Sequence, residues 1–181
     1  HRPFRRQRQM CIRDRSIFNS AGGGGARTVT EIIQHSSNIG MVKIVEQMPR
    51  AVFYDGLKRL ELDNITGTDL PFEAANILKG RNQFLMVPVE AATTAFGQGF
   101  SLTPLKLAQL HAALANGGKL VTPHVVRGLF DSKGQPYWQL PMPEPKQVFS
   151  ADTTTKVVAM RDRVGERGAG SMARLRGSRG A

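Results

Sequence analysis

Residues 28–40 read TVTEIIQHSSNIG, and this stretch decides how the rest of the sequence is interpreted. Thr28 and Glu31 have the spacing of a capping box, in which the Thr side chain accepts a hydrogen bond from the third helical amide and the Glu side chain reaches back. A short helix is therefore expected directly after Thr28. The triplet Ser36-Ser37-Asn38 follows this helix, and a second helix is expected from Ile39.

The triplet by itself is weak evidence for chemistry. Ser and Asn are common N-cap residues, so Ser37 or Asn38 could simply begin the helix at Ile39. That helix should bury one apolar face opposite Lys43 and end at Pro49. The apolar face of this helix is expected to consist of Met41, Val42, Ile44, Val45 and Met48. A further helical segment follows, with an apolar face expected to consist of Val52, Phe53, Leu57 and Leu60.

A second informative stretch begins with the glycines of Phe96-Gly-Gln-Gly-Phe100. No Lys-Ser/Thr pair follows them, so a tight turn is predicted here rather than a phosphate loop. Thr103-Pro104 is a strong helix start, because a Thr oxygen can cap the helix and Pro is favoured at its first position. The helix should run from Leu105 to Ala115 and stop at Asn116-Gly-Gly. It is apolar apart from Lys106, Gln109 and His111, which predicts a largely buried position.

Strands are expected only after this helix. They are predicted over residues 120–126, 127–130 and 137–139, with a turn at 131–134, before a proline-rich connector and a last helix capped by Ser150. Helices followed by a hairpin, without alternation of strand and helix, indicate an α+β fold with an antiparallel sheet.

The net charge of +11 is concentrated at the two ends of the 181-residue chain. Residues 1–15 and 156–181 each carry about +5, which leaves the middle close to neutral, so nucleic-acid binding is not expected. Residues 1–15 show no helical or strand period and are interpreted as a foreign or artefactual basic segment. Residues 16–165 are interpreted as a partial folded domain, and the Gly/Arg-rich residues 166–181 as a disordered tail.

Little in the sequence points to a metal, a cofactor or a membrane anchor. Cys11 is the one cysteine, and the four His residues form no His-x-x-x-His pair, so neither a disulfide nor a metal site is expected. No cofactor is predicted. No apolar run has the roughly 20 residues needed to cross a bilayer, and no signal peptide is evident.

The order and spacing of three blocks resemble a known family. Residues 28–40, 97–109 and 115–123 together are similar to the transpeptidase domain of class B penicillin-binding proteins, in particular the division-associated FtsI type. The resemblance covers about residues 26–165. It implies the fold of serine β-lactamases and penicillin-binding transpeptidases, an antiparallel sheet flanked by helices. It also implies peptidoglycan D,D-transpeptidase activity, in which a serine forms an acyl-enzyme with the D-Ala-D-Ala stem peptide or with a β-lactam.

The resemblance assigns roles to individual residues. Ser36 and Asn38 match the Ser-x-Asn motif of the family. Ser36 would relay a proton to the departing D-Ala, Asn38 would hydrogen-bond the bound peptide, and Ser37 would point away. The turn Gly97-Gln98-Gly99 and the helix start at Thr103 would support the cleft.

The two other family motifs do not occur in this sequence. No Ser is followed three residues later by Lys, and there is no Lys-Thr-Gly, so the nucleophile Ser and base Lys are expected to lie outside the chain. We therefore expect an inert internal fragment of a transpeptidase. In the intact protein the resemblance implies an inner-membrane anchor, a periplasmic domain and possible divisome partners. Two alternatives stay open: a non-catalytic interaction module of the same fold, and a β-lactamase or β-lactam-sensor relative.

Overall fold

The structure is a computed structural model that describes residues 9–12, 15–18 and 25–167. The chain forms two compact units, each described by itself below. Unit 1 contains residues up to 56, residues 79–100 and residues from 156 onward. Unit 2 contains residues 57–78 and 101–155.

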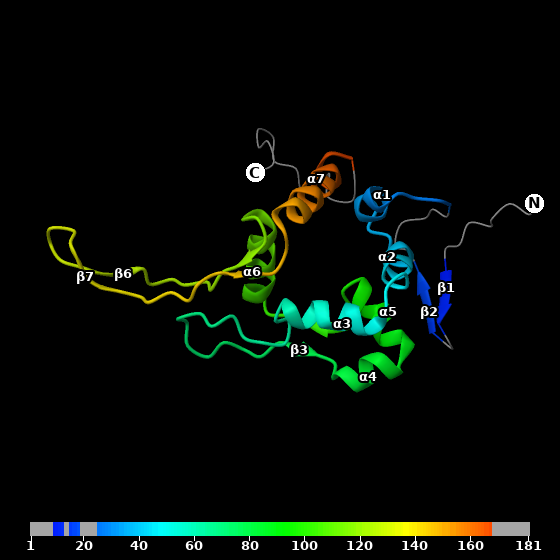
Figure 1. Cartoon of the computed structure of the whole chain (residues 1–181), viewed down its shortest axis with the longest axis horizontal. Coiled ribbons are helices and arrows are strands. Elements are labelled where there is room, and N and C mark those ends of the chain that lie inside the picture. Colours follow the sequence, from blue (N-terminus) through cyan, green and yellow to red (C-terminus); the bar gives the residue numbers. More distant parts are fainter. Residues whose placement is uncertain (1–8, 13–14, 19–24, 168–181) are drawn as a thin grey trace, which may run out of the picture. The chain divides into compact units, whose positions relative to one another are not determined.

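Unit 1 is built mainly from short helices and one hairpin (Figure 1). The strands β1 and β2 pair antiparallel, with Met10 opposite Ile17. A strand at residues 9–12 was not expected from the sequence, and neither were the helices α4 and α5. The elements of this unit are β1 (Gln9–Ile12), β2 (Arg15–Phe18), α1 (Val29–Gln34), α2 (Asn38–Val45), the start of α3 (Arg50–Arg59), α4 (Arg81–Met86) and α5 (Pro88–Ala95).

The core of unit 1 lies where α2 packs against β2 and α5. Its buried residues are Ile17, Ile39, Val42 and Ala92, and Phe96 packs against them. Burial of Val42 confirms the predicted apolar face of the second helix. The sequence pattern of α2 therefore determines where this helix lies in the unit.

A second cluster in unit 1 is aromatic. Phe84 of α4 is fully buried, and its ring centroid lies 5.1 Å from that of Tyr54 and 5.7 Å from that of Phe53. The Tyr54 hydroxyl donates to the carbonyl oxygen of Lys79 at 3.1 Å. The prediction for α3 was wrong at Val52, which is 58% exposed, because Tyr54 occupies the buried face.

Unit 2 holds one complete helix, α6 (Pro104–Ala115), and several short strands. β5 pairs antiparallel with β8, and β6 with β7. The remaining elements are β5 (Lys119–Leu120), β6 (Gly128–Phe130), β7 (Pro136–Gln139) and β8 (Lys146–Gln147), while β3 (Ile77–Leu78) and β4 (Phe100–Ser101) lie where the chain passes between the units.

The strand expected over residues 120–126 is wrong beyond Leu120. The amides of Val125 and Val126 do not join a strand ladder, because both donate to the Asp69 carboxylate, at 3.0 and 2.8 Å. These backbone hydrogen bonds stabilise the carboxylate and hold the pKa of Asp69 below its usual value. A loop aspartate therefore takes the place of a partner strand.

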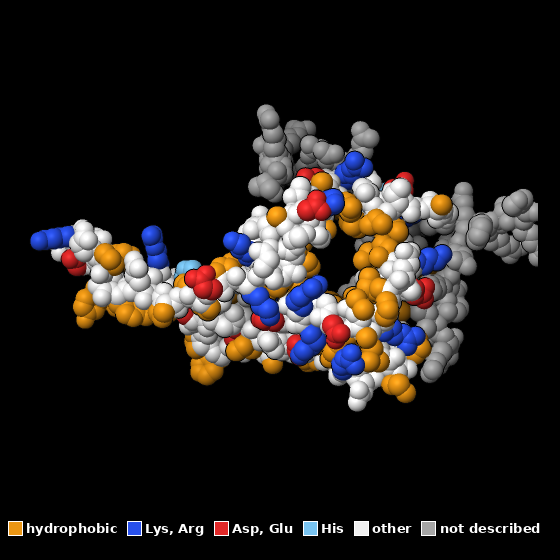
Figure 2. Space-filling model, viewed as in Figure 1, with side chains coloured by type: hydrophobic (Ala, Val, Ile, Leu, Met, Phe, Trp, Pro, Cys, Tyr) orange, Lys and Arg blue, Asp and Glu red, His pale blue; other side chains and the backbone are white. Residues whose placement is uncertain are grey.

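The predicted hairpin is confirmed, with β6 one residue shorter and β7 one residue longer than expected. Leu129 of β6 lies opposite Trp138 of β7. Both side chains are largely exposed, as are Phe130 and Tyr137. Figure 2 shows the resulting line of hydrophobic side chains along the hairpin.

Helix α6 begins and ends as predicted, but it is only partly buried. Thr103 caps it by accepting from the Lys106 amide at 3.1 Å, and it ends at Asn116 with Gly117 at a φ of 81°. Lys106 is 0% exposed, whereas Leu107 is 49% exposed. Two of its polar residues, Lys106 and Gln109, face inward, whereas His111 is exposed.

A short chain of hydrogen bonds explains how Lys106 and Gln109 can be buried. Lys106 Nζ donates to Gln109 Oε1 at 2.9 Å, and Gln109 Nε2 donates to the Val121 carbonyl oxygen at 2.8 Å. Burial lowers the pKa of Lys106, and the nearby carboxylates of Glu61, Glu73 and Asp63 oppose this shift only in part. Lys106 and Gln109 are thus linked to each other and to the backbone within the unit.

The last helix, α7 (Ala151–Arg167), begins as predicted after Ser150, whose hydroxyl accepts from the Thr153 amide at 3.2 Å. It continues two residues past the expected domain limit at residue 165. The expected disordered tail otherwise lies outside the described residues. Among the helices that the structure describes, none has both the length and the apolar character needed to cross a bilayer.

Candidate functional site

The connection between α1 and α2 carries the Ser-x-Asn triplet. Helix α1 begins with the predicted capping box: the Thr28 hydroxyl accepts from the Glu31 amide at 3.3 Å, and Glu31 Oε2 accepts from the Thr28 amide at 2.8 Å. The hydrogen bonds that Glu31 Oε2 accepts, first from the Thr28 amide and then from the Thr28 hydroxyl at 2.9 Å, lower the pKa of Glu31. The carboxylate is therefore committed to the cap rather than to acid–base chemistry.

Helix α1 ends in a Schellman motif. The Ser36 amide donates to the Ile33 carbonyl oxygen at 3.1 Å, and the Ser37 amide donates to the Ile32 carbonyl oxygen at 3.0 Å. This arrangement places Ser36 at the left-handed position, with a φ of 48°. Gly is the usual residue at that position, because a Cβ atom is strained there.

The Ser36 side chain is exposed at this turn. A non-glycine residue in the left-handed region costs on the order of 1–2 kcal/mol, and such positions often occur at functional sites. The turn thus presents one hydroxyl group on a backbone that is fixed by hydrogen bonds on both sides.

Capping of α2 is the role of Ser37. Its side chain is 4% exposed and accepts from the Gly40 amide at 3.1 Å. The sequence left Ser37 and Asn38 as alternatives for this role, and the structure selects Ser37. Capping therefore accounts for the middle residue of the triplet and not for Ser36 or Asn38.

Asn38 is the first residue of α2 and is half-buried. The following turn packs tightly on α1: a Cβ atom at Gly40 would lie 2.7 Å from two side-chain carbons of Ile32. Gly40 and Ile32 therefore fix the position of the start of α2 against α1, and Ser36 and Asn38 lie at this fixed junction.

The predicted tight turn at Gly97-Gln98-Gly99 is confirmed. The Gly97 amide donates to the Thr94 carbonyl oxygen at 3.1 Å, with a φ of 89° at Gly97. A Cβ atom at Gly99 would lie 2.8 Å from the Thr94 amide nitrogen, so no side chain fits there. This turn leaves the end of α5, the helix that packs against α2, and both belong to the same unit as Ser36.

Thr103, the remaining predicted site residue, belongs to unit 2. Its hydroxyl caps α6, and its amide donates to Asn76 Oδ1 at 2.7 Å. The Asn76 Nδ2 group in turn donates to the Asn64 carbonyl oxygen at 2.7 Å. These contacts give Thr103 a structural role within its unit.

A hollow of about 160 Å³ lies further along α2, between it and α5. Glu46 and Arg50 line it together with apolar side chains, and Ser36 and Asn38 do not. Sequence analysis did not anticipate this hollow, because α5, which forms one of its walls, was not predicted. Pro88 at the first position of α5 is the signal that could have revealed it.

The described side chains offer limited means for chemistry. Their His, Cys, Asp and Glu residues form no group of three or more that could hold a metal ion. At the junction itself, the Ser36 hydroxyl can accept and donate a proton, and the Asn38 amide can both donate and accept hydrogen bonds. The junction can therefore bind a peptide group and pass a proton.

Comparisons with known proteins agree with this geometry. A family model described as the penicillin binding protein transpeptidase domain matches residues 2–180. A peptidoglycan D,D-transpeptidase FtsI homolog of Mesostigma viride is 36% identical over 165 residues, which are 83% of this chain and 28% of that protein. A second FtsI homolog, from Chlorokybus atmophyticus, is 42% identical over 104 residues, which are 56% of this chain and 15% of that protein.

A solved structure supports the same assignment. The penicillin binding protein 3 of Mycobacterium tuberculosis, complexed with aztreonam, superimposes with a TM-score of 0.83 at 26% identity, covering 93% of this chain and 39% of that one. The predicted α+β transpeptidase fold is thereby confirmed. The chain spans less than a third of the length of the two curated relatives. It belongs to the penicillin-binding protein transpeptidase domain family.

Proposed function

We propose that this chain is part of a peptidoglycan D,D-transpeptidase that cross-links stem peptides during cell-wall and septum synthesis. In this proposal the nucleophilic Ser and its Lys base are supplied by polypeptide outside the chain. Ser36 passes a proton to the departing D-Ala amine, and Asn38 hydrogen-bonds the bound peptide. The same residues would take part in the reaction with β-lactams.

One observation carries the proposal: the cap of α2 is made by Ser37. Helix capping was the simplest alternative explanation of the Ser-x-Asn triplet. With Ser37 buried as the cap, an exposed Ser36 in a strained backbone conformation is left without a capping role. An exposed hydroxyl on a fixed turn is the arrangement that proton transfer between two reacting groups needs.

The chemistry requires more than these two residues. The attacking Ser oxygen would form an ester bond with the carbonyl carbon of the penultimate D-Ala, while the amide bond to the terminal D-Ala breaks and its nitrogen gains the proton. A second amine then takes the acyl group from the Ser. Because no Ser-x-x-Lys and no Lys-Thr-Gly occur in the sequence, we propose that the isolated chain is inert.

Localisation and partners follow from the family names alone. Two relatives are FtsI homologs and a third is stage V sporulation protein D of Bacillus subtilis. We propose that the intact protein is held at the inner membrane by an anchor outside this chain, with this domain in the periplasm and with division proteins as possible partners.

The proposal is tested by labelling with a fluorescent penicillin. The intact protein is compared with its Ser36→Ala and Ser37→Ala variants, and with the isolated 181-residue chain. We expect the intact protein to be labelled, and Ser36→Ala to slow labelling by about 10²-fold or more, which is the usual contribution of a positioned acid–base group. Ser37→Ala serves as the matched control. It also removes one hydroxyl group, but that hydroxyl caps α2 and has no proposed role in the reaction.

Two results would contradict this proposal. Labelling of the isolated chain would mean that the nucleophile lies within the 181 residues. Equal effects of Ser36→Ala and Ser37→Ala on the labelling rate, at equal folded fractions, would mean that Ser36 contributes only to the fold.

A non-catalytic interaction module is the second candidate function, because the β6–β7 hairpin exposes Phe130, Tyr137 and Trp138. Aromatic residues in exposed clusters are typical of protein interaction surfaces. An intact protein that is folded but takes up no penicillin label would favour this alternative.

A further inference from the structure

We propose that the hollow between α2 and α5 binds a small zwitterionic amino acid of about the size of alanine. The hollow lies entirely within unit 1. It is lined by Val42, Val45, Glu46, Met48, Arg50, Pro88, Ala91 and Ala92.

The size of the hollow restricts the ligand. Its volume of about 160 Å³ corresponds to about five water molecules at roughly 30 Å³ each. Drug-sized ligands occupy pockets of roughly 300–1,000 Å³, so the hollow is too small for a nucleotide or a disaccharide. A molecule of about six non-hydrogen atoms, such as alanine, fits this volume.

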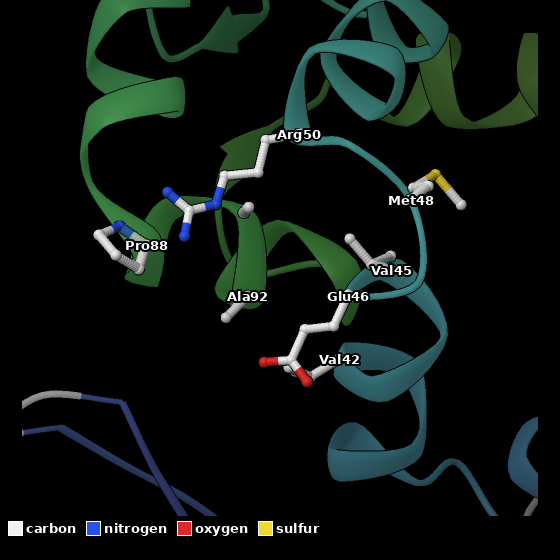
Figure 3. Close-up of a pocket in the computed structure, with 8 residues that line it drawn as sticks. Val42, Val45, Glu46, Met48, Arg50, Pro88 and Ala92 are labelled. Atoms are coloured by element: carbon white, nitrogen blue, oxygen red, sulfur yellow. The ribbon is translucent and has the colours of Figure 1, made fainter.

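Two opposite charges border the hollow (Figure 3). The Glu46 carboxylate and the Arg50 guanidinium both extend toward the side where Pro88 and Ala92 lie. Among the described residues, neither side chain takes part in an ion pair, although they line the same hollow. Arg50 Nη1 donates to the Leu85 carbonyl oxygen at 2.9 Å, which holds the guanidinium in place and leaves further donors for a ligand.

The helix termini increase this separation of charge. Glu46 is the C-cap residue of α2, at the negative end of the helix dipole, where a cation is favoured and a carboxylate is not. Arg50 is the first residue of α3, at the positive end of its dipole, where an anion is favoured. An ammonium group beside Glu46 and a carboxylate beside Arg50 would therefore satisfy both the side chains and the dipoles.

The remaining surface suits a short apolar side chain. Ala91, Ala92, Val42 and Val45 are buried and form an apolar surface that carries no charge. A methyl group can lie against them, whereas a long polar side chain would lose hydration there. D-alanine is the preferred probe, a choice that rests on the proposed function, since the proposed reaction releases D-alanine.

The test is titration of the isotopically labelled 181-residue chain with D-alanine, followed by amide NMR. Because both charged side chains are exposed to solvent, we expect a dissociation constant of about 1–10 mM, with shifts confined to residues 42–50 and 88–92. Propionate lacks the ammonium group and ethylamine lacks the carboxylate, so each should bind at least about tenfold more weakly.

Variants identify the two charges. Glu46→Gln and Arg50→Gln should each weaken D-alanine binding by about tenfold or more. Lys43→Gln, on an exposed position of α2 outside the hollow, should leave the dissociation constant unchanged. The absence of shifts at 50 mM D-alanine, equal binding of propionate, or equal effects of all three variants would overturn the proposal. Penicillin labelling of the intact protein does not enter this test, so the two proposals can fail separately.

Discussion

Helices α2 and α6 begin in the same way, but α6 buries polar side chains alongside apolar ones. Ser37 caps α2 and Thr103 caps α6, each through a hydroxyl that accepts from an amide three residues later. In α2 the buried side is apolar, as Val42 shows. In α6 the buried side chains include Lys106 as well as the apolar Ala113, both 0% exposed, whereas Leu107 is 49% exposed.

The difference shows what decides the orientation of a helix in this protein. Helix α2 lies on apolar partners, so its hydrophobic pattern is sufficient. Helix α6 lies near the carboxylates of Glu61, Asp63 and Glu73, and the Val121 carbonyl oxygen accepts from Gln109, so an ammonium and an amide are buried beside the apolar Ala113. The surroundings of a helix, and not its composition, decide which face is buried when polar partners are available.

The largest effect is expected from Lys106→Ala. This change removes a fully buried side chain and leaves Gln109 Oε1 without its donor. It also removes the positive charge that interacts with three nearby carboxylates. We expect a loss of about 2–4 kcal/mol in the free energy of unfolding of unit 2, measured from hydrogen exchange of the α6 amides. If Leu107→Ala costs more than Lys106→Ala, the orientation of α6 described here is wrong.

Lys106→Met removes the charge but keeps a side chain of similar length. It should therefore lower the free energy of unfolding less than Lys106→Ala does.

The pH dependence of stability gives an independent check. Burial lowers the pKa of Lys106 in the folded state below the unfolded value of about 10.4. Between these two values the unfolded chain holds more protons, so stability should rise with pH toward about 10.4. Lys106→Met should lack this rise.

Asn76→Ala should produce the second largest effect. The Asn76 side chain is 6% exposed and joins the loop at Asn64 to the Thr103 amide through two hydrogen bonds. Its loss leaves two backbone groups unpaired, which should cost about 2 kcal/mol. Asn76→Asp keeps the acceptor for Thr103 but sets an oxygen against the Asn64 carbonyl oxygen. No measurable loss for Asn76→Ala in hydrogen exchange would contradict these roles.

Sequence reasoning worked where a local pattern controls the structure. The capping box at Thr28, the helix start at Thr103 and the turn at Gly97 depend on residues within a few positions of one another. It failed where distant groups compete. Val125 and Val126 were predicted to be strand residues, but the Asp69 carboxylate, more than fifty positions earlier, takes their amides.

The same distinction applies to the candidate site. Ser36 and Asn38 were found from their motif, because their spacing is local. The hollow on α2 was not found, because it also requires α5, whose sequence gives few helix signals apart from Pro88. A site that is formed by contacts between two helices is therefore harder to predict from sequence than a site whose residues are adjacent in the chain.

The cap of α2 can be tested with Ser37→Ala. Removal of its hydroxyl leaves the Gly40 amide without an acceptor, and we expect a loss of about 1 kcal/mol, measured by urea unfolding. Ser37→Asp keeps an acceptor at the cap and should recover most of this stability. If Ser37→Ala has no effect and Asn38→Ala destabilises instead, Asn38 is the cap and the argument for Ser36 loses its support.

The smallest effect, and the one of opposite sign, is expected from Ser36→Gly. Glycine removes the Cβ strain of the left-handed position, about 1–2 kcal/mol, but costs about 0.5–1 kcal/mol in extra freedom of the unfolded chain. A net stabilisation of about 0.5 kcal/mol should appear in urea unfolding, whereas Ser36→Ala, which keeps the Cβ atom, should change stability little. In the intact protein both variants should nevertheless lose penicillin labelling to the same extent, because both lack the hydroxyl. A more stable protein that reacts more slowly would mean that Ser36 is kept at a cost to the fold for its chemistry; a labelling rate unchanged by Ser36→Gly would mean that the strain has no catalytic purpose.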